Sequence, residues 1–221
     1  MTLDAATWQM LGKGFIETLY MVFGSTLIGY LIGLPLGVLL VVTRKGGIHP
    51  ISWVNAVVGV ITNIFRSIPF IILLIMVMPV TRAIVGTTLG AKAVIPPLVI
   101  ASAPYIARVV EGELSEVDNG VIEAAKSMGA SDWQIIWKVL LPEAKPSLLL
   151  GAALVLTTVV GYSCMSGFVG GGGLGDIAIR YGYYRYDVTI MMITVVILII
   201  IVQLIQEAGS RLSKKSDRRI R

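Results

Sequence analysis

Few side chains in this sequence could carry enzyme chemistry. It contains one cysteine, Cys164, and one histidine, His49. A zinc site needs several such ligands, and a catalytic Ser-His-Asp or Cys-His group would have to use this one histidine. His49 lies in a basic turn with Gly and Pro at 44–50, where a structural role is far more common. We therefore predict no catalytic residue and no metal site.

Two glycine patterns bear on nucleotide binding. The phosphate-binding pattern Gly-x4-Gly-Lys-Ser/Thr does not occur. The run GGGGLG at 170–175 formally fits the dinucleotide pattern G-x-G-x-x-G, but it follows an apolar segment rather than a strand. Because glycine permits close backbone approach, we interpret this run as a flexible or tightly packed re-entry. We expect the chain to bind no cofactor itself.

The composition indicates that lipid surrounds much of the chain. It is 56% hydrophobic and 14% charged, with a mean hydropathy of +0.85, whereas soluble domains carry about 25% charged residues. A helix needs about 20 apolar residues to cross a bilayer. The sequence predicts an all-α membrane protein with five transmembrane helices, at 15–42, 54–80, 92–110, 148–166 and 188–206.

The basic residues predict the orientation of these spans. Twelve of the 18 fall on one side of the predicted membrane, six of them in the last eleven residues, and five fall on the other side. The richer side is expected to be cytosolic, so the N-terminus lies outside and the C-terminus inside. We expect one transmembrane domain at 14–207 and a basic cytosolic tail at 208–221, and no nucleic-acid binding.

The cytosolic loop at 111–147 reads as two short helices. Asp118 or Asn119 can cap the first, and Gly129 stands where a left-handed C-terminal cap belongs. Ser131 and Gln134 form a capping-box pattern for the second helix, which Pro142 is expected to end.

The second helix has an apolar stripe at Trp133, Ile136, Trp137 and Leu140. Short helices are marginal alone, so these must pack against the membrane ends of the spans or against a partner. A surface hairpin that only closes a long loop is an equal alternative on physical grounds.

The loop resembles the EAA motif of the permease subunits of bacterial type I ABC importers. The matching residues are Glu123, Ala124, Ala125, Gly129, Val139, Leu141 and Pro142. Val139 replaces the usual isoleucine. The resemblance implies that the loop seats in a cleft of a separate ATPase as a coupling helix. The chain would then be a transport subunit rather than an enzyme, with ATP and Mg²⁺ used by the partner.

The similarity extends over essentially the whole chain. The segment at 63–74 resembles the second-span signature of amino-acid importers of this class. The segments at 103–108 and 160–165 and the following Gly run are similar to permeases of methionine importers. This implies a multi-pass subunit of the bacterial inner membrane that imports L- and possibly D-methionine. It also implies a homodimer with two ATPase subunits and an extracytoplasmic substrate-binding lipoprotein. Another amino acid as substrate, an ion-coupled secondary transporter and a membrane scaffold without transport activity remain the alternatives.

Two residues inside the spans, Arg66 and Met165, are candidates for the transport pathway, and a third polar residue, Glu17, has another expected role. Arg66, three residues before Pro69, could attract a substrate carboxylate or gate the path. Alternatively it lies near the cytosolic end of an over-long span and snorkels. Met165 could help close an outer gate in a dimer, with ordinary packing as the alternative. Glu17 is expected to be an interfacial carboxylate.

Overall fold

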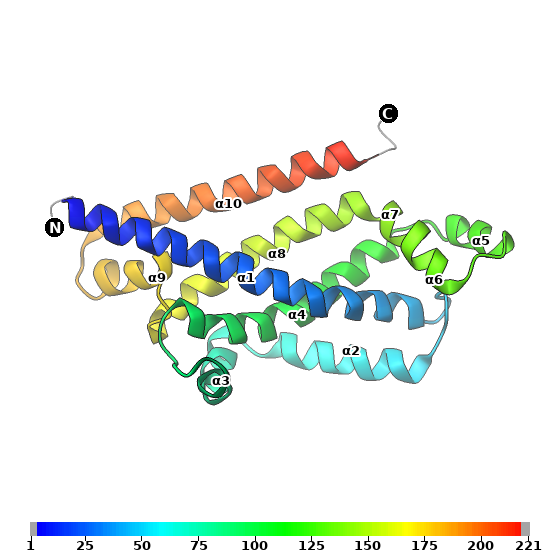
Figure 1. Ribbon diagram of the computed structural model, residues 1–221, viewed down its shortest axis with the longest axis horizontal. Helices are drawn as coiled ribbons and strands as arrows, with labels where there is room; N and C mark the ends of the chain where they lie inside the picture. The colour runs from blue at the N-terminus through cyan, green and yellow to red at the C-terminus, as the bar shows by residue number, and fades with distance from the viewer. Residues whose placement is uncertain (1–3, 218–221) are drawn as a thin grey trace. The chain divides into compact units, whose positions relative to one another are not determined.

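The computed structural model describes residues 4–217, and within that range it contains helices and loops but no strand (Figure 1). The chain forms two compact units. Unit 1 contains the described part of Met1–Gly29, together with Ile68–Ser102 and Leu156–Ile205. Unit 2 contains Tyr30–Ser67, Ala103–Val155 and the described part of Gln206–Arg221. The predicted all-α class is confirmed.

Four helices among the described residues are long and apolar enough to cross a membrane. They are α1 (Ala5–Thr43), α4 (Ala91–Ser115), α8 (Lys145–Met165, continued by the 3₁₀ turn η2, Ser166–Val169) and α10 (Val188–Ser216). Each is longer than its apolar segment, because polar residues continue the helix at the ends. At the start of α1, for example, Asp4 accepts a hydrogen bond from the Thr7 amide at 2.9 Å. The helix α10 likewise continues into the predicted tail, whose residues 218–221 lie outside the described residues.

The second predicted span is not one helix. A single helix was expected at 54–80, but α2 (Ser52–Ser67) and α3 (Phe70–Val85) are bent by 104° at a break between them. Pro69, with ψ of 134°, explains the break. Proline lacks the amide hydrogen that an α-helix needs and disfavours helical geometry at the preceding residue, Ile68. A fifth span exists only if this bent pair is counted as one.

Two glycines on α1 allow it to pack closely against α4 within unit 2. A Cβ atom on Gly33 would lie 2.6 Å from the carbonyl oxygen of Ala103, and one on Gly37 would lie 2.7 Å from that of Ala107. The glycines are four residues apart and so share one face of the helix, as in the small-residue motifs of membrane helix pairs. Any larger residue at either position would push the two backbones apart.

The glycine run after α8 is tightly packed, which is one of the two interpretations that its composition allowed. It lies in unit 1 and leads through α9 (Gly173–Ile177) into the π-helical turn η3 (Ala178–Tyr183). A Cβ atom on Gly167, just before the run, would lie 2.7 Å from the backbone carbonyl carbon of Gly175. From α1, the Glu17 carboxylate accepts a hydrogen bond from the Gly173 amide, and the Thr18 hydroxyl accepts one from the Leu174 amide, each at 2.9 Å. Glu17 therefore binds the start of α9, a contact that was not predicted.

Candidate functional site

The loop at 111–147 contains the two predicted helices. The first, α5, spans Asn119–Ser127, and the side chain of Asp118 caps it by accepting a hydrogen bond from the Gly120 amide at 2.6 Å. Gly129, just beyond its end, has a φ of +78°, a left-handed conformation that favours glycine. Glu123 and Ala124 are exposed, while Ala125 is buried. The helix thus presents one small, acidic face outward.

The second helix begins with the predicted capping box. The Ser131 amide donates to the Gln134 side chain at 2.9 Å, and the Gln134 amide donates to the Ser131 hydroxyl at 3.4 Å. These reciprocal bonds satisfy two amides that the first turn of α6 (Asp132–Ile135) would otherwise leave free. The turn between α5 and α6 is therefore fixed by its own residues.

The prediction that Pro142 ends the second helix is wrong. The helix widens instead into a π segment, η1 (Ile136–Leu140), in which the Leu141 amide donates to the carbonyl of Ile136. It then continues as α7 (Leu141–Glu143), with one turn residue before α8. Because Pro142 has no amide hydrogen to place in a regular α ladder, the wider turn allows the helix to pass through it. Val139, Leu141 and Pro142 thus form a nearly continuous helical path into α8.

The predicted apolar stripe is divided between two environments. Leu140 is buried, as is Ile135, which the stripe did not include. Trp133 and Trp137 are 68% and 52% exposed, and their rings meet edge to face with centroids 5.5 Å apart. Met128 is 82% exposed. The buried residues hold the loop to its own unit, and the exposed ones are typical of a surface that a partner covers.

A second loop, at 44–50, contacts both loop helices. The Lys126 ammonium donates to the Ile48 carbonyl at 3.2 Å, and His49 Nδ1 lies 3.1 Å from Asp132 Oδ2. The sequence predicted a structural role for His49, whereas Lys126 was one of the twelve basic residues on the predicted cytosolic side. The contacts join residues about 80 positions apart, which no local pattern reveals.

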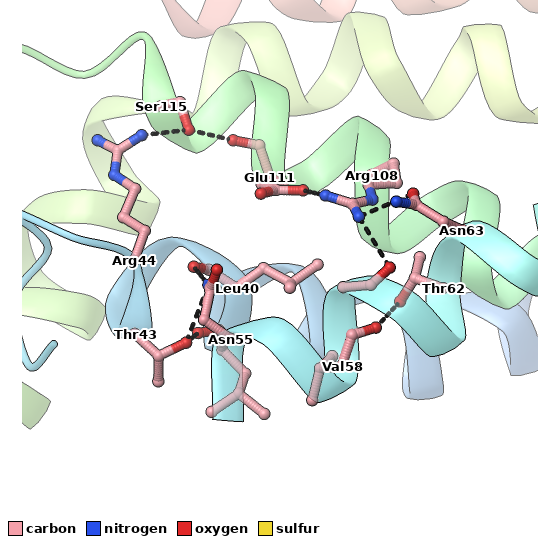
Figure 2. Close-up of polar contacts among 12 residues, drawn as sticks. Leu40, Thr43, Arg44, Asn55, Val58, Thr62, Asn63, Arg108, Glu111 and Ser115 are labelled. Carbon is pink, nitrogen blue, oxygen red and sulfur yellow. Dashed lines mark hydrogen bonds and ion pairs between the residues drawn. The ribbon is translucent and has the colours of Figure 1, made fainter. Parts of the chain in front are cut away.

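Arg108 joins α2 to α4 within unit 2, as Figure 2 shows. Its guanidinium donates to the Glu111 carboxylate at 2.6 Å, to the Gly59 carbonyl at 3.0 Å and to the Asn63 side chain at 2.8 Å. Hydrogen bonds to charged groups are stronger than neutral ones. Arg108 was one of the twelve basic residues on the predicted cytosolic side, and nothing in the sequence predicted that it would bond α4 to α2.

A second polar chain in Figure 2 fixes the end of α1. The Arg44 guanidinium donates to the Ser115 hydroxyl at 2.7 Å, and that hydroxyl donates to the Glu111 carbonyl at 2.6 Å. From α2, the side-chain amide of Asn55 donates to the Leu40 carbonyl at 2.7 Å and to the Thr43 hydroxyl at 3.2 Å. These bonds hold the ends of α1, α2 and α4 together at the base of the loop.

The two pathway candidates lie in different units. Arg66 is exposed in the last turn of α2, directly before the break at Pro69. Met165 is the last residue of α8 and is 45% exposed. Among residues 4–217 no group of three or more His, Cys, Asp or Glu side chains could hold a metal ion.

Comparison with known proteins places this helical chain and its loop in a family. Residues 29–221 match the family described as binding-protein-dependent transport system inner membrane component. The chain belongs to this family. This inner membrane component is a multi-pass transport permease rather than an enzyme, and the predicted class and localisation are confirmed.

Relatives within the family support the resemblance seen in the sequence. The probable D-methionine transport system permease protein MetI of Vibrio cholerae is 50% identical over 214 residues, which cover 97% of this chain and 92% of that protein. The D-methionine transport system permease protein MetI of Escherichia coli K12 is 53% identical over 158 residues, covering 72% of this chain and 73% of its own length.

Solved structures of inner membrane components share the fold. An inward-facing structure of the MetNI methionine ABC transporter contains a chain that is 50% identical, with a TM-score of 0.96, covering 98% of this chain and 100% of that one. An amino acid ABC transporter at 20% identity has a TM-score of 0.77 over 97% of this chain and 100% of its own, which shows the fold alone. The type I ABC importer permease fold predicted from the sequence is confirmed.

Proposed function

We propose that this chain is the permease subunit of an ATP-driven methionine importer. It forms the translocation pathway as a homodimer, with two ATPase subunits on the cytosolic side and a substrate-binding lipoprotein outside. The proposal is supported by the names of the relatives and by the matching structure of a methionine ABC transporter. L-methionine is the substrate, and D-methionine is a second one.

One observation carries the coupling role. The segment with the EAA register, at 123–142, is held by its own caps and by its buried side chains, and it still exposes Trp133, Trp137 and Met128. Burying one large apolar side chain contributes about 1.5–3 kcal/mol. A folded loop that leaves three of them uncovered is therefore suited to a protein partner rather than to water. This disfavours the alternative of a self-contained surface hairpin.

The motif residues have distinct roles in this proposal. Exposed Glu123 and Ala124 let the ATPase approach α5 closely, while Ala125 packs inward. Gly129 sets the angle between α5 and α6 through its left-handed turn. Val139, Leu141 and Pro142 carry any displacement of the loop directly into α8, because η1 and α7 are helical up to that point. ATP and Mg²⁺ are bound and used by the ATPase, and the permease converts its closure into a change of pore access.

The orientation follows from charge. The N-terminus lies outside and the C-terminus inside, because the loops at 44–50 and 111–147 and the residues after 207 carry most of the basic side chains. We call residues 111–147 the coupling loop, and this orientation puts it on the side of the membrane where ATP is available. The variants Lys45→Cys and Lys92→Cys test this orientation through the accessibility of each thiol from the two sides of the membrane. The assignment is reversed if the residue at 92 proves to be cytosolic.

Two residues have proposed roles in the transport pathway. Arg66, at the exposed end of α2, attracts the substrate carboxylate, and Arg66→Gln is expected to lower uptake without uncoupling ATP hydrolysis. Full uptake by that variant would leave Arg66 with a structural role only. Met165 closes the outer gate against its symmetry mate. A nucleotide-dependent disulfide between Met165→Cys subunits in a Cys164→Ala background tests this, and no crosslink in any state contradicts it.

The decisive experiment reconstitutes the chain with its ATPase and binding protein in liposomes. Methionine uptake is expected to require ATP inside, and methionine with the binding protein is expected to stimulate ATP hydrolysis. The chain alone is expected to transport nothing. Uptake by the chain without the ATPase, driven by an ion gradient, would instead establish the secondary-transporter alternative.

A further inference from the structure

The loop that connects α1 to α2 is a fixed turn, not a slack linker. We call residues 44–50 the brace loop. Its backbone is closed by hydrogen bonds from the Gly47 amide to the Arg44 carbonyl at 2.9 Å and from the His49 amide to the Val42 carbonyl at 3.0 Å. The side chain of Ile48 is buried. A turn held in this way moves together with the helix ends that it joins.

The brace loop contacts the coupling loop on both sides of the Gly129 turn. Lys126, in the last turn of α5, donates to the Ile48 carbonyl, and Asp132, the first residue of α6, faces His49. A cavity of about 120 Å³ between the two loops is lined by Gly47 and Ile48 on one side and by Ile122 and Glu123 on the other. The contact therefore reaches both coupling helices and not one alone.

Covalent connection alone would let the coupling loop act only on α4 and α8, which precede and follow it. The brace loop adds the end of α1 and the start of α2. Its two ends are fixed in turn, because Arg44 bonds to Ser115 and Asn55 bonds to the Leu40 carbonyl. A displacement of α5 and α6 must therefore be shared by all four helix ends in unit 2.

We infer that the brace loop is a second route by which movement of the coupling loop reaches the membrane helices. His49 and the Ile48 carbonyl are its positioning groups. This inference rests on the proposed coupling to an ATPase. The pair formed by His49 and Asp132 is exposed on both sides, at 63% and 49% of the side-chain surface. Exposed pairs contribute little to stability. Loss of this pair should therefore change transmission and leave the folded permease intact.

The experiment separates transmission from folding and from docking. One variant carries His49→Ala together with two glycines inserted after Gly46, which moves the Ile48 carbonyl away from Lys126. The control is Lys45→Ala, an exposed lysine in the same loop. Both are reconstituted with the ATPase and binding protein, and methionine transported per ATP hydrolysed is measured. The first variant is expected to lower this ratio about fivefold with the ATPase still bound, and the control to match the wild type.

Two further variants make the result specific. His49→Lys, in a loop of normal length, places a cation opposite Asp132 and is expected to give a ratio close to that of the wild type. Crosslinking His49→Cys to Asp132→Cys with a short thiol reagent, in a Cys164→Ala background, is expected to leave transport working, because the two loops move as one body.

Some outcomes would overturn the inference. A normal ratio in the insertion variant would do so, as would loss of transport on crosslinking. Release of the ATPase by the insertion variant would reduce the brace loop to a docking support. Failure of the wild-type chain to bind any ATPase would instead overturn the proposed function, so the two failures are distinguishable.

Discussion

The coupling loop in unit 2 and the glycine run in unit 1 each connect two membrane-associated helices, but different kinds of contact fix them. The coupling loop is closed by local caps at Asp118 and Ser131 and exposes large aromatic side chains. The glycine run has no side chains of its own to form caps, and Glu17 and Thr18 of α1 bind its backbone. The ends of the helices in the coupling loop are thus capped by nearby side chains, whereas the backbone of the glycine run is bound by side chains of another helix.

The largest effect is expected when a methyl group is added to the tightly packed glycine run. In Gly175→Ala the new Cβ atom would overlap the backbone of Cys164, which cannot yield as a flexible side chain could. Overpacking of this kind costs about 1–3 kcal/mol and occasionally more. We expect a large drop in the yield of monodisperse permease and in its thermal unfolding midpoint.

The matched control for that prediction is Gly161→Ala on α8, where nothing lies within 4 Å of the added Cβ atom. It is expected to be neutral or slightly stabilising, because alanine favours a helix over glycine. Equal destabilisation by the two variants would contradict the tight packing described for the run.

A charge reversal on the coupling loop should weaken partner binding and leave folding unchanged. Glu123→Lys places a cation on the exposed face of α5 and is expected to leave folding and membrane insertion unchanged. It should reduce co-purification of the ATPase and ATP-dependent uptake at least tenfold, about 1.4 kcal/mol or more in binding. Glu116→Lys, outside both helices, is the control. Equal loss of the ATPase in both variants would indicate a general charge effect.

The anchoring of the glycine run by α1 can be tested with less drastic changes. Glu17→Leu removes the acceptor for the Gly173 amide, and an unsatisfied buried donor costs about 1–3 kcal/mol. The thermal unfolding midpoint should fall by several degrees. Glu17→Gln keeps an oxygen acceptor and should recover most of the loss. If the two variants were equally destabilised, the charge of Glu17 rather than its hydrogen bond would be the important property.

The smallest effect is expected at the cap of α6. Ser131→Ala removes one acceptor, which costs about 1 kcal/mol for helix caps in general. Because α6 is a short local element, we expect faster hydrogen exchange of the amides at 133–135 with little change in global unfolding. A large fall in the unfolding midpoint would contradict this prediction, because it would mean that the cap supports the rest of the unit as well as α6.

What the sequence could predict corresponds to this division. Helix caps depend on residues only two to four positions apart, so Asp118, Gly129, Ser131 and Gln134 could be assigned from the sequence. The apolar segments likewise gave the helical membrane class. Contacts between distant residues, such as Arg108 with Asn63 or Lys126 with Ile48, leave no periodic signal and were missed.

The two prolines show a subtler limit. Pro69 and Pro142 each remove one backbone donor, yet the helix breaks at the first and passes the second through a π segment. A proline shows where the regular helical hydrogen bonds must be interrupted. The surrounding packing determines whether the helix then breaks or continues through a π segment. Local chemistry alone therefore predicted a continuous helix at 54–80 and a helix end at Pro142, and both predictions were wrong.

The π segment at Ile136–Leu140 also determines rotational phase. Each residue of an α-helix turns the chain by roughly 100°, and a π turn holds more residues than an α turn. Deleting one residue from this segment would convert it to regular helix and rotate everything before it relative to α8. Trp133 and Trp137 would then point in a new direction with every motif residue still present. The number of residues in this segment therefore sets the direction in which Trp133 and Trp137 point relative to α8. Under the proposed coupling, a change of one residue here would require a differently oriented surface on the ATPase.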